Sequence, residues 1–159
     1  MIPIGFDHHD HTACVSDALT MAEKHCADSG LRLTPVRRRV LEILLAEHRA
    51  LGAYDVLSVL ASEGLGATPP VAYRALDFLV KARFIHKIEA LNAYVACAHL
   101  GADHAPAFLI CRTCKSVAEA NTATGGGRLD QAARAAGFQI EHQVIEAEGL
   151  CPRCLDAAQ

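Results

Sequence analysis

The 159-residue sequence lacks any apolar run long enough to cross a bilayer, which takes about 20 residues in a helix. Its apolar stretch from Val40 to Ala46 is broken by Glu42. The first residues also lack the basic segment of a secretory signal peptide and instead carry Asp7 and Asp10. We therefore expect no membrane partner and a cytoplasmic protein.

The sequence also lacks the low hydrophobicity of a disordered chain, because 52 % of its residues are hydrophobic. Its length suits one domain or two small ones. The seven cysteines are an odd number and have metal-like spacing, which favours a reducing compartment over a disulfide framework.

A large positive charge is missing too, since the net charge is −3. The charge is unevenly distributed, however. Residues 1–30 carry −4 and residues 84–159 carry −2, whereas residues 31–83 hold eight Lys and Arg against five acids, or +3. A locally basic segment is the electrostatic footprint of phosphate contact. The surplus is modest, so a nucleic-acid partner needs support from motifs.

Two Cys-x-x-Cys turns dominate the C-terminal half: Cys111 with Cys114, and Cys151 with Cys154. Four thiolates are the ligand set of closed, tetrahedral structural zinc sites. The 36 residues between the pairs exceed the spacing of a compact zinc ribbon, so the metal would join the two ends of a small domain. The alternative is two unrelated redox or unliganded pairs, but a thioredoxin-like motif occurs once, at a helix start after a strand.

The N-terminal half predicts helices. A tail at residues 1–14 contains His8, His9 and His11, which could collect a metal loosely but have no fixed geometry. A helix is expected over residues 17–28. Thr34-Pro35 signals the next helix start, and apolar residues recur at helical spacing through three segments, residues 35–48, 53–62 and 69–80.

These three short helices suit a helix-turn-helix. Tyr73 and Arg74 lie near the start of the last one, where residues of a recognition helix reach base edges, and Arg can bind guanine bidentately. Arg37, Arg38 and Arg39 lie largely off the apolar face and could contact phosphate. An exposed helix face without a ligand is the alternative for Tyr73 and Arg74.

Two strand-like runs, residues 84–89 and 93–97, flank a turn at Leu91-Asn92 and predict a wing hairpin. The winged-helix DNA-binding domain therefore covers residues 15–97, and residues 98–106 are a hinge. Residues 107–159 form the second domain, with strands at 108–111, 116–120 and 138–146 and a helix at 128–136. This α+β region is small, so zinc and dimerisation would both help it.

The chain resembles the ferric uptake regulator family. The resemblance rests on these segments, which follow one another in the family's order: Arg32-Leu-Thr-Pro-Val-Arg, Ala53-Tyr-Asp, Pro69-Pro-Val-Ala-Tyr-Arg-Ala-Leu-Asp-Phe-Leu, Phe84-Ile-His-Lys-Ile-Glu and the two Cys-x-x-Cys turns. Within the family it is most similar to the zinc uptake regulator branch, through Tyr73-Arg-Ala-Leu-Asp-Phe-Leu and Val144-Ile-Glu-Ala-Glu-Gly-Leu-Cys.

The resemblance implies a homodimeric, metal-dependent repressor of double-stranded operator DNA, without a small-molecule substrate. It implies two Zn²⁺ per chain: a structural one on the four cysteines and a regulatory one. It assigns the regulatory ligands to residues of the wing, its end, the hinge and the second domain: His86, Cys97, His104 and Glu119. It also places Tyr54, Tyr73 and Arg74 at DNA-contact positions. His99 and Asp103 lie close enough in sequence to compete with His104.

We expect a zinc-responsive repressor that controls zinc uptake genes. The alternative function keeps the fold and senses iron, manganese or peroxide, which a cysteine ligand at Cys97 disfavours. A zinc enzyme such as a nucleobase deaminase would need His-x-Glu upstream of Pro-Cys-x-x-Cys, and neither half is present. We therefore predict no enzymatic activity.

Overall fold

The computed structural model describes residues 11–47, 49–66, 68–102, 104–121 and 127–157. Four helices come first: α1 (His11–Asp28), α2 (Pro35–Leu45), α3 (Ala53–Ser62) and α4 (Pro69–Lys81). A hairpin of β1 (Ile85–Ile88) and β2 (Ala93–Ala96) follows, joined by the short 3₁₀ helix η1 (Glu89–Leu91). The remaining elements are β3 (Pro106–Cys111), β4 (Val117–Asn121), α5 (Arg128–Ala135), β5 (Ile145–Gly149) and α6 (Pro152–Asp156).

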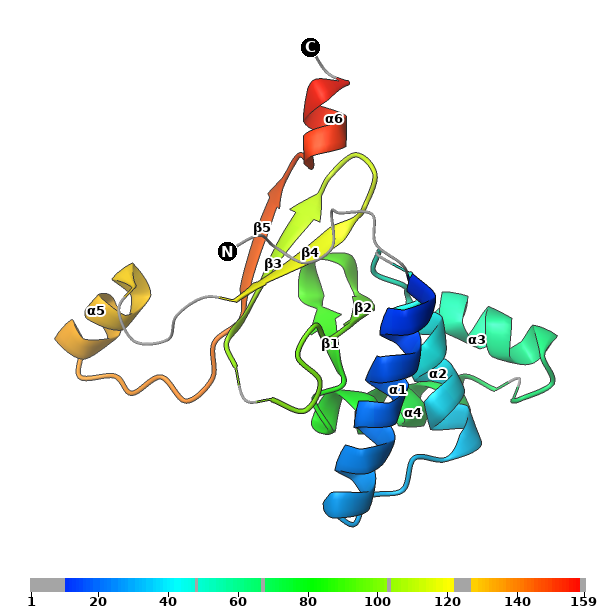
Figure 1. Cartoon of the computed structure of the whole chain (residues 1–159). Helices are drawn as coiled ribbons and strands as arrows, with labels where there is room; N and C mark the ends of the chain where they lie inside the picture. Colours follow the sequence, from blue (N-terminus) through cyan, green and yellow to red (C-terminus); the bar gives the residue numbers. More distant parts are fainter. Residues whose placement is uncertain (1–10, 48, 67, 103, 122–126, 158–159) are drawn as a thin grey trace.

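The helices pack as the sequence predicts, with the wing hairpin at their side (Figure 1). Thr34 caps α2, because its Oγ1 accepts a hydrogen bond from the Arg37 N–H at 3.4 Å and Pro35 fits the first helical position. Their core consists of apolar side chains that are fully buried, among them Val40, Leu41, Leu44, Val56, Leu60, Leu76, Leu79 and Phe84.

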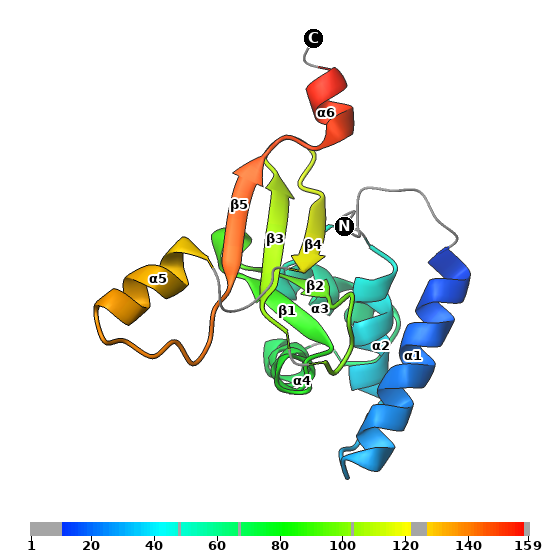
Figure 2. The same ribbon diagram turned by 60° about the vertical axis from the view of Figure 1, so that its left-hand side comes forward.

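The C-terminal sheet has the strand order β4-β3-β5. Strand β4 pairs antiparallel with β3, and β5 pairs parallel with β3. Figure 2 shows the three strands side by side, with α5 beyond the β5 edge and α6 at the far tip. A small buried cluster joins this sheet to the wing: Ile88 of β1 packs with Phe108, Ile110 and Val117.

Several predicted boundaries were wrong. Helix α1 begins at His11, so residues 11–14 belong to a helix and not to a tail; residues 1–10 lie outside the described part. The strand predicted over residues 138–146 forms only from Ile145 to Gly149. The wing turn is the 3₁₀ helix η1, which ends at Leu91, and the next residue, Asn92, is in the left-handed region at φ 45°. Helix α6 was not predicted.

In the part of the chain that the structure describes, no helix is both long and apolar enough to span a bilayer.

Candidate metal centres and nucleic-acid interface

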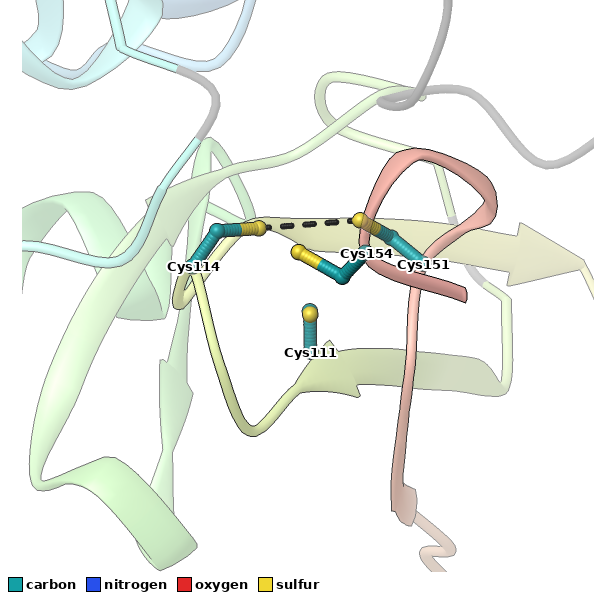
Figure 3. Close-up of side chains that lie close together, drawn as sticks. All are labelled: Cys111, Cys114, Cys151 and Cys154. Atoms are coloured by element: carbon teal, nitrogen blue, oxygen red, sulfur yellow. Dashed lines mark hydrogen bonds between the residues drawn. The ribbon is translucent and has the colours of Figure 1, made fainter. Parts of the chain in front are cut away.

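The two Cys-x-x-Cys turns meet at the tip of the sheet (Figure 3). Parallel pairing aligns Cys111 at the end of β3 with Gly149 at the end of β5, two residues before Cys151. The Arg112 N–H donates to the Gly149 carbonyl at 2.9 Å and fixes this register. The Sγ atoms of Cys111, Cys114, Cys151 and Cys154 all lie within 4.8 Å of one another. This geometry disagrees with the alternative of two unrelated pairs.

The surroundings of the four thiols suit a cation. Hydrogen bonds from the backbone of Cys114, Cys151 and Thr113 lower the pKa of Cys111 to about 6. The hydrogen bond with the Cys151 sulfur, burial and the other sulfurs raise the pKa of Cys154 to about 12. Hydrogen bonds with Ser116 lower the pKa of Cys114 as well. Thiolates are therefore favoured at Cys111 and Cys114, whereas ionisation of Cys154 is opposed until a cation compensates the charge. The four soft ligands fit Zn²⁺ and leave no open position for a water.

A second cluster lies where the wing meets the sheet. His86 comes from β1, Cys97 follows β2, His104 precedes β3 and Glu119 lies on β4. One ligand atom from each lies within 4.8 Å of the other three. His104 Nε2 is 2.6 Å from Glu119 Oε1 and 3.6 Å from Cys97 Sγ.

The environment of His86 is the strongest evidence that this cluster fits a metal. Its Nε2 atom is buried and has no hydrogen-bond partner among the described residues, and it lies 3.7 Å from Glu119 Oε1. An unpaired buried polar atom is costly. Burial lowers the pKa of His86, and the charges of His104 and His142 lower it further, whereas the Glu119 charge raises it. The imidazole is therefore kept neutral, which is the form that binds a metal.

Cys97 is a weaker acid than an ordinary cysteine. Burial and, to a smaller extent, the Glu119 charge raise the pKa of the Cys97 thiol to about 12. A hydrogen bond from the His99 N–H to the sulfur lowers the pKa and only partly offsets this rise. The thiol therefore stays protonated without a metal and must lose its proton to bind one. One thiolate, two imidazoles and a carboxylate suit Zn²⁺ better than Mg²⁺ or Mn²⁺.

His99, one of the two competitors for His104, does not belong to this cluster. The His99 ring is exposed, and its centroid lies 5.5 Å from that of His104. Asp103 lies outside the described residues.

The predicted DNA-contact residues of α3 and α4 face solvent. Tyr54 is 69 % exposed and Tyr73 is 41 % exposed. Arg74 is exposed as well, and among the described residues its Nε donates only to the Pro70 carbonyl of its own helix, at 3.3 Å. These side chains are available to a partner.

The arginines of α2 are less available. Arg37 lies over the Phe78 ring, 3.7 Å from its centroid, and Arg38 is paired with both Glu23 and Glu42. Arg39 bridges Glu42 and Glu63, and its pKa is raised by these carboxylates. A DNA phosphate would have to displace these partners, so the predicted role of Arg37 and Arg38 at DNA stays a prediction.

Comparisons with known proteins decide the family. The model of the ferric uptake regulator family matches residues 28–148. This chain belongs to that family. The zinc uptake regulation proteins of Escherichia coli (strain K12) and Shigella flexneri are each 41 % identical to it over 142 residues, which cover 88 % of this chain and 82 % of each relative.

Solved structures of the family show which arrangement this chain adopts. A zinc uptake regulator complexed with zinc and DNA superposes with a TM-score of 0.84 at 39 % identity, covering 91 % of this chain and 97 % of its own. The structure of holo XcZur has a TM-score of 0.79 at 38 % identity and covers 88 % of this chain and 98 % of its own. The structure of apo XcZur has a TM-score of only 0.50 at 39 % identity, although it covers 89 % of this chain and 97 % of its own. The arrangement described here is thus closer to the holo structure.

Sequence reasoning missed one residue that contacts the wing, Glu146 of β5. Its carboxylate accepts hydrogen bonds from the backbone N–H groups of Glu89 and Ala90. No sequence signal identifies such a contact, because any residue except proline presents the same N–H group.

Proposed function

We propose that this chain is a zinc-responsive transcriptional repressor that binds palindromic operator DNA as a homodimer and controls zinc uptake genes. The observation that carries this proposal is that the residues of the second cluster come from two different parts of the chain. His86 and Cys97 belong to the wing, whereas Glu119 belongs to the sheet. A site that needs both parts makes the position of the wing depend on metal.

The two clusters support a count of two Zn²⁺ per chain. Cys111, Cys114, Cys151 and Cys154 would hold the structural ion, and His86, Cys97, His104 and Glu119 the regulatory one. Zn²⁺ supplies a tetrahedral centre that binds thiolate, imidazole and carboxylate together. The buried Cys97 thiol is a poor ligand for Mn²⁺, which argues against a manganese sensor on this fold.

The residues of the second cluster also act without a metal. Glu119 Oε2 accepts the Ala98 N–H at 2.9 Å, while Oε1 contacts His104, so this one carboxylate orients both the end of the wing and the segment before β3. His104 Nδ1 lies 3.1 Å from the Ala102 carbonyl, which leaves Nε2 facing the cluster. These contacts preorganise the ligands.

At the DNA, Tyr54, Tyr73 and Arg74 are the residues that we expect to contact the operator. A two-fold operator requires two reading helices at fixed spacing. Two wings held firmly on a dimeric sheet domain meet that requirement. Because a four-thiolate centre is closed, it also supports a binding function rather than catalysis.

Metal analysis tests the two-site proposal. The purified protein is expected to contain two zinc ions per chain and to retain one after dialysis against a mild chelator, because the closed thiolate site contributes folding energy and a sensing site must exchange. Inductively coupled plasma measurements before and after dialysis decide it. A single ion per chain, lost together with the fold, would contradict the proposal. Parallel loading with Fe²⁺ and Mn²⁺ tests the alternative signals.

Arg74→Ala tests the reading helix. The substitution is expected to weaken operator binding by about 1–3 kcal/mol and to relax base preference at one position, if Arg74 contacts guanine bidentately. Binding to the operator, to single-base variants and to random DNA is measured at several salt concentrations. Arg38→Ala is the comparison: if Arg38 contacts phosphate in place of Glu23 and Glu42, its loss should weaken binding to all sequences alike and flatten the salt dependence. Equal losses on operator and random DNA for Arg74→Ala would show that α4 does not read bases.

A further inference from the structure

Glu146 of β5 holds the turn of the wing with both of its carboxylate oxygens. Oε1 accepts the Glu89 N–H at 2.7 Å, and Oε2 accepts the Ala90 N–H at 3.0 Å. These N–H groups belong to the first turn of η1, where helical N–H groups have no partner within the helix. A charged acceptor makes such hydrogen bonds stronger than a neutral one does.

A second carboxylate holds the opposite end of the same hairpin. Phe108 of β3 pairs with Glu119 on β4 and with Glu146 on β5, so the two acids flank Phe108 in one row across the sheet. Neighbouring strands lie about 4.8 Å apart, which puts the two backbone positions about 10 Å from each other. Four-residue strands such as β1 and β2 span a similar length. Glu119 therefore meets the hairpin at Ala98, and Glu146 meets it at the turn.

The wing–sheet interface beside Glu146 is partly packed and partly open. Ile88 and Phe108 are buried in one cluster, and the His86 ring centroid is 5.3 Å from that of Phe108. A cavity of about 680 Å³ borders His86 and His104 as well as Glu89 and Glu146. The contacts of Glu146 and the regulatory cluster thus belong to the same wing–sheet interface, although Glu146 is not one of the four ligands.

We propose that Glu146 is a positioning residue, which fixes the turn of the wing on the sheet without contacting the metal and thereby presents His86 and Cys97 to Glu119. The inference rests on the proposed function and deepens it. Glu119 also contacts the wing without a metal, at the Ala98 N–H, but it is one of the four proposed ligands, whereas Glu146 contacts the wing and takes no part in metal binding. It raises the fraction of molecules whose wing is already placed for both zinc and operator, and the apparent affinities for both scale with that fraction.

Glu146→Gln tests the proposal with little change in size. The amide oxygen can still accept one N–H, but the amide nitrogen then faces the other donor. Amide hydrogen exchange at Glu89 and Ala90 in the full-length, zinc-free protein is expected to become about tenfold faster, the factor for one charged hydrogen bond. Affinity for the regulatory zinc should fall about threefold to tenfold. The absorption spectrum of Co²⁺ placed in that site should not change, because no ligand is altered.

Glu148→Gln is the matched control. Glu148 is the other acid of β5; it is exposed, whereas Glu146 is half-buried, and its side chain has no hydrogen bond or ion pair with any described residue. In the Glu148→Gln variant, hydrogen exchange at the Glu89 and Ala90 amides and the affinity for zinc should be the same as in the wild type. A changed Co²⁺ spectrum in Glu146→Gln would make Glu146 a ligand and overturn the proposal, as would unchanged exchange or unchanged zinc affinity.

Operator titrations separate this inference from the proposed function. Glu146→Gln should lose affinity for operator DNA at saturating zinc by a factor similar to its loss in zinc affinity. If the wild type shows no zinc-dependent operator binding, the proposed function is wrong, and exchange and zinc affinity still decide the role of Glu146. If only the variant's exchange rate changes, the contact exists but does not position the wing.

Discussion

Cys97→Ser is expected to yield a folded protein that keeps its four-cysteine zinc and no longer responds to added zinc. The reason is chemical: a serine hydroxyl has nearly the size of the thiol but does not ionise to a soft ligand near neutral pH. Operator affinity with zinc should fall to the zinc-free value. Allosteric couplings of this kind are typically about 5–150-fold, so the loss is easily measured.

The experiment titrates operator DNA into wild type and variant, each with and without zinc. Reciprocity gives an independent check, since operator DNA must tighten zinc binding in the wild type by the same factor by which zinc tightens DNA binding, and this effect must vanish in Cys97→Ser. His99→Ala is the control, because His99 lies beside the cluster but on its exposed rim. Full zinc-dependent binding by Cys97→Ser would place the sensing site elsewhere, with His99 and Asp103 the first residues to test.

Local patterns predicted the helical half of this fold well. Thr34-Pro35 and the apolar periodicity of α2 and α4 are properties of neighbouring residues, and they are realised in the structure as a capped helix and a buried face. Each Cys-x-x-Cys turn is also a local pattern, and the structure brings the two turns together. The approach of the two turns to one another, by contrast, depends on the parallel pairing of β3 with β5.

The strand leading to Cys151 shows where a local pattern misleads. Alternation from Phe138 to Glu146 predicted a strand, yet residues 138–144 are not paired and Phe138 is 66 % exposed. Alternation predicts a strand only when one face is buried. In the described chain, β5 is an edge strand whose residues are mostly exposed, so its bounds are set by pairing with β3 instead.

The arginines of α2 illustrate a second limit. Three consecutive arginines in a basic segment suggest phosphate contact, but their neighbours in space are Glu23, Glu42, Glu63 and Phe78. Residue spacing reveals the Glu42 contacts, which are three and four positions away. It does not reveal Glu23 on α1 or Glu63 beyond α3. The same holds for Glu146, whose partners lie more than fifty residues back.

Cys111→Ser is expected to have a much larger effect on the fold than Cys97→Ser. Cys111 is 1 % exposed at the end of β3, and its sulfur belongs to the cluster that joins β3 to the segment after β5. Structural zinc contributes about 10–16 kcal/mol of apparent binding energy in small domains. That is as large as the whole stability of a typical domain, about 5–15 kcal/mol. Loss of one thiolate should therefore unfold the sheet or prevent its dimerisation.

The wild type, Cys111→Ser and Cys14→Ser are compared by thermal unfolding, zinc content and mass in solution. Cys14→Ser is the matched control, because Cys14 is an exposed thiol of α1 outside both clusters. Cys111→Ser should lose the zinc that resists chelation and the dimer, while the helices of the N-terminal half, whose core is separate, should keep their circular dichroism signal. A Cys111→Ser protein that remains a dimer with two tightly held zinc ions would show that the four-cysteine cluster is not the structural site.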